Sequence, residues 1–161
     1  MTKTIPQESF SKELLAIWEE TFETHHGIYL DKGTSLFETL DQISAEEASI
    51  PVGNRCATLA AQVEHVIFYL EVLERFIAGE DAGEIDWDEI WSRVSGVIPA
   101  EWDALRARLR VTYDRLSQRL RSIENWEHHD AIGDAMAMVV HTAYHLGEIR
   151  QALCTVKQPA E

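Results

Sequence analysis

Two histidines, His141 and His145, stand four residues apart in the segment AMVVHTAYHLGEIRQAL. In an α-helix this spacing puts both side chains on one face, about 40° apart around the axis. The segment is apolar on most sides, so two imidazole rings placed there would find few hydrogen-bond partners. A metal ion held between the rings would satisfy both of them. The spacing therefore predicts a metal site, with two ordinary hydrogen-bonded core histidines as the alternative.

A third histidine, His65, lies in the middle of a second helical pattern, CATLAAQVEHVIFYLEVLERF. When Glu64 is taken as the side that faces solvent, His65 falls on the edge of the apolar arc of this helix. Three histidines from two helices are a ligand set for an open metal site. Zinc bound in this way keeps one position for water or substrate, and nickel, iron or cobalt take the same ligands. We therefore predict a divalent transition metal, zinc or nickel first, on His65, His141 and His145.

Two carboxylates lie near the predicted ligands on the same helix. Glu148 follows His141 by seven residues and Asp134 precedes it by seven, which places each within about 20° of its direction. Either carboxylate is a candidate to orient an imidazole or to carry a proton in catalysis. The alternative is that both are solvated residues at the rim of the helix.

Three further polar residues are candidates for contact with a substrate. Gln62 and Tyr69 belong to the helix of the third histidine, and Arg150 points in an otherwise apolar direction. Each also has a structural interpretation: polar filling of the core for Gln62, packing for Tyr69, and an ion pair with another helix or across a dimer interface for Arg150. Trp87 and Trp91, spaced i, i+4, either pack in the core or cover the end of the helices where the site opens.

The two cysteines are not expected to bind the metal. Cys56 lies about 180° around its predicted helix from His65, and Cys154 lies more than about 120° from the other two histidines. Thiol chemistry at this site would therefore need an external low-molecular-weight thiol. The cysteines form no CxxC spacing, which favours a reducing compartment over a disulfide scaffold.

Helical periodicity dominates the chain and predicts the elements that hold these residues. Glycine and proline fall mostly between the periodic segments, and no stretch alternates with period two for long enough to predict a strand. We predict an all-α fold, a bundle of four long helices in one domain that spans residues 1–161, with flexible ends at about 1–7 and 157–161. The long helices are expected at about 8–28, 55–78, 99–124 and 130–156, and short helical segments near 34–43 and 85–94.

The charge of the chain excludes several classes of partner. It has 28 acidic and 14 basic residues, which gives a formal net charge of −14. Such a surface repels phosphate backbones and anionic lipids, and the arginines between 106 and 121 alternate with acidic residues to form a solvated, charge-mixed face. No segment reaches the ~18 apolar residues that span a bilayer, and the first residues show no secretory pattern. We therefore expect a cytoplasmic protein that binds neither nucleic acid nor a membrane.

Three segments of the chain resemble the DinB-like family, which includes the YfiT-like metal-dependent hydrolases. They are GIYLDKGTSLFETL (27–40), AAQVEHVIFYLEVL (60–73) and HTAYHLGEIRQAL (141–153). The resemblance implies an up-down four-helix bundle with a long connection between the second and third helices. It also implies a metal on His65, His141 and His145, and a homodimer.

The predicted function has two main versions. In the first, the chain is a metal-dependent enzyme acting on a small molecule, either a thiol S-transferase, as some relatives in the family are, or a hydrolase. Its metal would lower the pKa of bound water or stabilise a thiolate. In the second, the chain is a non-catalytic, stress-related binding or interaction protein. Its metal is then structural, and a fourth side chain such as Asp41, Glu148 or His26 closes the coordination sphere. A helical dimer without metal, its three histidines held by backbone or carboxylate partners, is the remaining alternative.

Overall fold

The protein is helical throughout the part of the chain that the structure describes. The structure is a computed structural model and describes residues 5–54, 56–80, 83–87, 90–127 and 130–157. Within these ranges no residue belongs to a strand, which confirms the all-α prediction. The elements are α1 (Gln7–Phe22), α2 (Leu36–Leu40), α3 (Ala45–Ala48), the short 3₁₀ helix η1 (Val52–Asn54), α4 (Leu59–Ile77), α5 (Ile90–Arg93), α6 (Pro99–Ser122) and α7 (Ala131–Val156).

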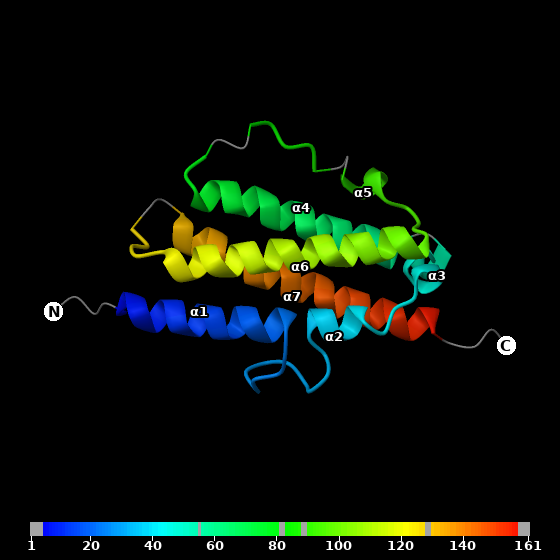
Figure 1. The fold of residues 1–161 in the computed structure, drawn as a ribbon, viewed down its shortest axis with the longest axis horizontal. Helices are drawn as coiled ribbons and strands as arrows, with labels where there is room; N and C mark the ends of the chain where they lie inside the picture. The colour runs from blue at the N-terminus through cyan, green and yellow to red at the C-terminus, as the bar shows by residue number, and fades with distance from the viewer. Residues whose placement is uncertain (1–4, 55, 81–82, 88–89, 128–129, 158–161) are drawn as a thin grey trace.

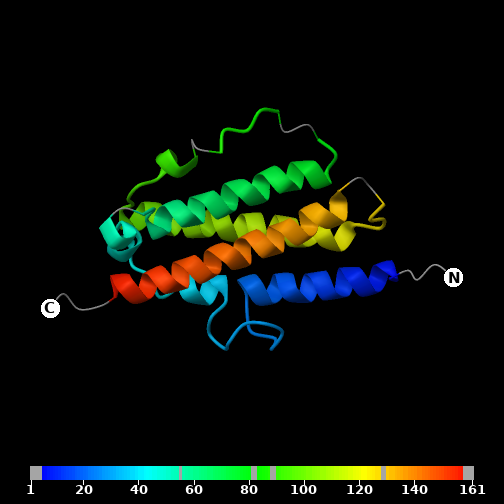
Figure 2. The ribbon, with the colours of Figure 1, turned by 180° about the vertical axis from the view of Figure 1, so that it is seen from behind.

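The four long helices, α1, α4, α6 and α7, lie side by side along the long axis of the molecule (Figures 1 and 2). α4 packs against α6 and α7, and α1 packs against the same two helices. α1 and α7 run in one direction and α4 and α6 in the other, because the connection between α4 and α6 returns along the length of the molecule (Figure 1). None of the described helices is both long enough and apolar enough to cross a membrane.

An aromatic cluster between α1 and α6 forms part of the core. Trp18 is fully buried, stacks on Tyr113 with ring centroids 5.6 Å apart, and donates a hydrogen bond from Nε1 to Ser117 Oγ at 2.8 Å. Phe22 packs on the same tyrosine at 4.9 Å. Each large side chain buried in this way stabilises the fold by roughly 2–3 kcal/mol, before the cost of ordering it. All four long helices also contribute aliphatic side chains, among them Leu14, Leu70, Leu109, Leu116, Met138 and Ile149.

The first helix ends six residues earlier than predicted, at Phe22 instead of residue 28. The buried carboxylate of Glu20 accepts hydrogen bonds from the backbone N–H groups of the following loop, at 3.0–3.3 Å. Gly27, inside that loop, has a φ of 80°, a left-handed conformation that ends a helix and favours glycine. The predicted end of this helix was wrong because the loop amides donate to the Glu20 side chain and not to the backbone carbonyls of a longer helix. The amides that donate belong to His26, Gly27, Ile28, Tyr29 and Leu30.

Several contacts hold the connection between α4 and α6 against the rest of the protein. Trp87 packs edge-on against Phe68 of α4, with ring centroids 5.9 Å apart. Near the start of α6, the N–H of Val97 donates a hydrogen bond to Ser49 Oγ at 2.9 Å, and this hydroxyl lies 3.1 Å from the Val97 carbonyl. Of the predicted short helix at 85–94, the structure shows the four residues of α5 as helical, and residues 88 and 89 lie outside the described residues. The predicted short helix at 34–43 contains the five residues of α2.

The prediction that Glu64 faces solvent was wrong. Glu64 is only 5% exposed, and its carboxylate pairs with Arg108 of α6 at 2.8 Å. The side chain of Arg108 is 43% exposed, so this ion pair lies at the edge of the α4–α6 interface. The arginines of α6 are therefore more than a solvated face, since Arg115 likewise pairs with Glu74 of α4 at 2.8 Å.

Candidate metal centre

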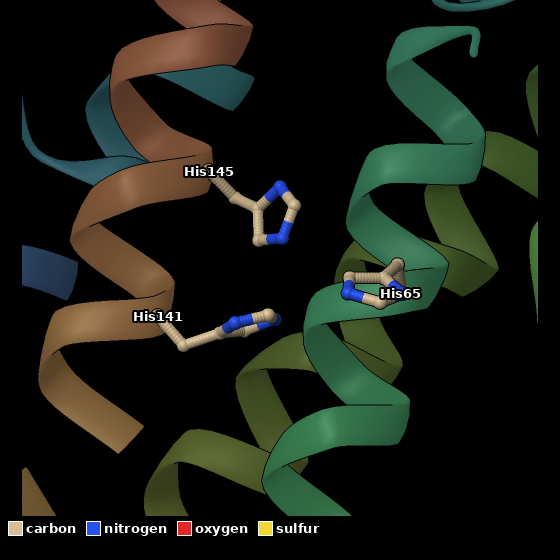
Figure 3. A group of neighbouring side chains, drawn as sticks. All are labelled: His65, His141 and His145. Carbon is tan, nitrogen blue, oxygen red and sulfur yellow. The ribbon is translucent and has the colours of Figure 1, made fainter. Parts of the chain in front are cut away.

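Three histidine rings from two helices meet at the interface between α4 and α7. His65 comes from α4, and His141 and His145 come from successive turns of α7 (Figure 3). The ring centroids are 4.4 Å apart for the pair on α7, and 5.0 and 4.8 Å from His65 to His141 and His145. One nitrogen of each ring lies within 4.8 Å of the others, close enough for a single metal ion. The prediction that these three residues come together is confirmed.

Two of the ring nitrogens are buried and have no hydrogen-bond partner among the residues that the structure describes. They are Nδ1 of His65 and Nε2 of His141. A buried polar atom left unpaired costs on the order of 1–3 kcal/mol, so folded proteins rarely retain one without a reason. Two such atoms in one cluster fit a divalent transition metal, because neutral imidazole nitrogen is a preferred ligand of zinc, nickel, cobalt and iron. The donor set present in the chain therefore matches the metal predicted from the sequence.

The third ring, His145, is held from its far side. Its Nδ1 lies 2.6 Å from Gln62 Oε1 on α4 and 2.9 Å from Glu148 Oε2, one turn along α7. Both neighbours are oxygen acceptors, so they favour the tautomer with the proton on Nδ1. That tautomer leaves the lone pair on Nε2, which is the arrangement found when a second residue orients a metal-binding histidine.

The environment keeps the cluster uncharged in the absence of metal. Burial, reinforced by the neighbouring His145 and opposed by Glu148, lowers the pKa of His65 to about 4. Burial together with the other two histidines lowers the pKa of His141 to about 3. Burial also lowers the pKa of His145, although the carboxylate of Glu148 opposes the shift. All three imidazoles are thus neutral near pH 7 and offer lone pairs instead of positive charge.

Aromatic rings enclose the cluster on two sides. Trp91 of α5 stacks on His65 with ring centroids 4.2 Å apart and an interplanar angle of 14°. Tyr69 stacks on His141 at 3.6 Å and 17°. The position of Trp91 agrees with one of the two alternatives predicted for Trp87 and Trp91, that they cover the site. Packing of Trp91 directly on one of the three histidines was not predicted, because sequence spacing does not say which face of α4 the connection crosses.

The other predicted site residues divide between the cluster and its surroundings. Gln62, Glu148 and Tyr69 each touch one of the three histidines. Asp134 is half-buried on α7, and burial, followed by the charge of Asp134, raises the pKa of Tyr69. Arg150 is turned away: its Nη1 donates a hydrogen bond to a threonine of α2, Thr39, at 3.3 Å.

The residues considered as a fourth ligand have other partners. Asp41 pairs with Arg106, and His26 lies 3.6 Å from a carboxylate oxygen of Glu19. Among the described residues that could donate to this ion, the cluster consists of the three histidines alone. His128 and His129 lie outside the described residues.

Neither cysteine joins the cluster. Both are exposed and unpaired. Cys56 precedes α4 instead of lying within it, because the helix starts only after Thr58, whose side chain caps it by accepting a hydrogen bond from Ala61 N–H at 3.1 Å. The helical angle predicted for Cys56 therefore does not apply, although its exclusion from the ligand set holds.

Comparison of the chain with protein-family models, with curated proteins and with solved structures gave no match in any of the three. The resemblance to the DinB-like family therefore stays a prediction, and the geometry of the three histidines is the basis for assigning a function.

Proposed function

We propose that this protein binds one divalent transition metal through His65, His141 and His145. The two unpartnered nitrogens carry this proposal, since one metal ion would satisfy both of them together. Zinc and nickel are the first candidates, and iron and cobalt suit the same three imidazoles. Gln62 and Glu148 would hold the ring of His145 in the tautomer that such an ion requires.

We further propose that the metal serves a reaction of a small molecule, as a thiol S-transferase or a hydrolase of the DinB-like kind. The long connection between the second and third long helices, α4 and α6, agrees with what the resemblance implies. A divalent metal held there would supply Lewis acidity and positive charge to a bound ligand. Glu148, whose carboxylate lies 2.9 Å from His145 Nδ1, and Asp134 on the same helix are our candidates to hold or carry a proton there. Because both cysteines lie outside the cluster, a transferase would take its thiol from solution.

A structural metal in a non-catalytic binding protein is the second candidate. The stacking of Trp91 on His65, which is only 7% exposed, favours it, because covered ligands are typical of closed sites. Against it, each of the three side chains named as a fourth ligand has another partner: Asp41 pairs with Arg106, His26 lies against Glu19, and Glu148 contacts Nδ1 of His145. We therefore prefer the open site and the enzyme.

Metal analysis of the purified protein tests the first proposal. We expect one zinc or nickel ion per chain in the wild type and loss of nearly all of it in His141→Ala. His25→Ala is the matched control, because His25 is an exposed histidine in the loop after α1 and its removal should leave the metal content unchanged. A metal-free wild type that also fails to take up added zinc or nickel, or an unchanged content in His141→Ala, contradicts the proposal.

Titration of a cobalt-substituted protein with small thiols separates the functional versions. New sulfur-to-cobalt charge-transfer bands would show a free coordination position that accepts a thiolate, as the transferase requires. Unchanged bands with every thiol tested, together with no exchangeable water on the cobalt, would leave the structural metal as the function.

A further inference from the structure

A cavity of about 460 Å³ lies between α4 and α6, two helices that run side by side in the same direction (Figure 1). α5, in the connection between them, contributes one side chain to its wall. None of the three histidines of the candidate metal centre lines it. Its volume falls within the range typical of natural sites for small molecules. The cavity is therefore a second candidate binding site, distinct from the histidine cluster.

Arginine is concentrated in this cavity, although the chain as a whole has a net charge of −14. Four of the ten arginines of the sequence line it: Arg75, Arg93, Arg115 and Arg119. The acidic residues in its wall are three glutamates, Glu71, Glu74 and Glu80. The lining thus has an excess of one positive charge in a strongly acidic protein, which favours a singly charged anion as ligand.

Arg119 has a guanidinium group that can bind such an anion. Four arginines of α6 pair with carboxylates, among them Arg115, which Glu74 holds through three contacts of 2.8–3.0 Å. Within the described part of the chain no carboxylate forms an ion pair with Arg119, which is exposed. A guanidinium offers two parallel N–H groups that fit both oxygens of a carboxylate. The helix dipole also favours a cation in the last turn of α6, but this reason applies equally to Arg121.

Phe68 and Val72 give the cavity an apolar wall at the end away from Arg119. Arg119 and Ile77 line a neighbouring hollow together, which places Arg119 beside the C-terminal end of α4. Phe68 lies nine residues before Ile77, about 14 Å along the helix axis. Arg93 of α5 lies over the ring of Phe68, with its guanidinium carbon 5.3 Å from the ring centroid. A ligand with one anionic end and an apolar body of several carbons would therefore contact both ends of the cavity.

We propose that this cavity binds a small organic monocarboxylate, with the carboxylate on Arg119 and the apolar body extended along α4 towards Phe68. A single negative charge matches the excess of one positive charge, whereas a phosphate dianion would exceed it and leave the apolar wall unused. The helix that supplies Arg93 also places Trp91 on His65, so α5 borders both this cavity and the histidine cluster. Binding here does not require the metal, because no histidine of the cluster takes part.

Titration of the purified protein with hexanoate, followed by NMR of the arginine Nε–Hε groups, tests the ligand class. Hexanoate should bind one site per chain in a saturable manner and shift the signal of Arg119. Hexanamide has the same apolar body without the charge and should bind about tenfold more weakly, because the charge-assisted hydrogen bonds are lost. Inorganic phosphate should also bind more weakly than hexanoate. Hexanamide that binds as tightly as hexanoate, phosphate that binds more tightly, or the absence of a saturable shift at Arg119 overturns the proposal.

Two variants of Arg119, measured by isothermal titration calorimetry, test the position of the carboxylate. Arg119→Gln should lower the affinity for hexanoate about tenfold, and Arg119→Glu on the order of 100-fold, because the second change also adds repulsion. Arg121→Glu is the matched control: it changes the charge by the same amount in the same last turn of α6, and Arg121 does not line the cavity. Circular dichroism checks that all three variants keep their helices. An unchanged affinity in Arg119→Glu, or an equal loss in Arg121→Glu, overturns the proposal.

Discussion

Gln62 of α4 and His145 of α7 are joined across the helix interface by a contact of 2.6 Å between Gln62 Oε1 and His145 Nδ1. Glu148 Oε2 reaches the same nitrogen at 2.9 Å. An amide oxygen and a carboxylate oxygen thus converge on one ring nitrogen and leave the opposite nitrogen directed at the other two histidines. The contact connects the packing of the two helices to the orientation of a predicted ligand.

Removal of Gln62 should therefore weaken metal binding without removing a ligand. We expect Gln62→Leu to lower the metal affinity about tenfold, and Gln62→Leu with Glu148→Leu to lower it about 100-fold, because the ring of His145 loses the partners that fix its tautomer. Competition with a chromophoric chelator measures the affinities. Gln118→Leu, a change at an exposed glutamine of α6, serves as control. Equal affinities in the double variant and the wild type would show that these contacts do not support a ligand.

Trp91 should report metal binding through its fluorescence. Its ring lies 4.2 Å from that of His65, so a nickel or cobalt ion bound to that histidine would quench its emission strongly. We expect Trp91→Phe to abolish most of the metal-dependent quenching in a fluorescence titration. Trp126→Phe should leave it in place, because Trp126 bonds to Ser11 of α1 instead. Quenching of the same size in both variants would place the bound metal elsewhere.

Local geometry was sufficient to predict the pair on α7, and the inward direction of His65 together with the family resemblance predicted the third member of the cluster. The i, i+4 spacing of His141 and His145 fixes their shared face in any regular helix, and the apolar arc of the second helix was wide enough to include His65. The wrong prediction that Glu64 faces solvent did not affect the prediction for His65. The buried arc of α4 is wider than predicted and also contains Glu64, whose carboxylate pairs with Arg108 of α6.

The features that were missed depend on contacts between distant parts of the chain. Arg150 bonds to Thr39, which lies 111 positions away, and its direction on α7 alone could not reveal that partner. The stacking of Trp91 on His65 likewise depends on the path of the connection over α4. Helical periodicity predicts which side chains lie on each face of a helix, but it does not predict which other element packs against that face.

The buried carboxylate of Glu64 should make Arg108 more important than the other arginines of α6. Arg108→Ala leaves a carboxylate that is 7% exposed without its cation, and we expect a loss of about 1–2 kcal/mol in the free energy of unfolding. The loss stays this small because the arginine is itself 43% exposed and solvent screens its charge. Arg115→Ala should cost less than about 1 kcal/mol, since its partner Glu74 is 20% exposed.

Urea unfolding of Arg108→Ala and Arg115→Ala measures the difference between their free energies of unfolding. Adding Glu64→Leu to Arg108→Ala should restore stability, because it removes the unpaired buried charge. A double variant less stable than Arg108→Ala would show that Glu64 stabilises the fold by some other contact.

Glu20 should make the stability of the fold depend on pH in acid. Burial raises the pKa of Glu20, but the hydrogen bonds from the backbone of the loop after α1 outweigh it, and the pKa lies below the ordinary value of 4.5. The folded state therefore holds the proton less tightly than the unfolded chain does. The carboxylate contributes its full stabilisation above about pH 4.5, and this contribution is lost as the pH falls through the lowered pKa. Glu20→Gln should cost about 2 kcal/mol at pH 7, because charge-assisted hydrogen bonds are lost.

The difference in free energy of unfolding between the wild type and Glu20→Gln should then become smaller as the pH drops below about 4.5, where the wild-type carboxylate takes up its proton. Urea unfolding at several pH values, followed by circular dichroism, measures it. Glu8→Gln provides the control, since Glu8 is exposed in the first turn of α1 and should give little difference at any pH. A gap that stays constant into acid would mean that the loop is held by the shape of the Glu20 side chain and not by its charge.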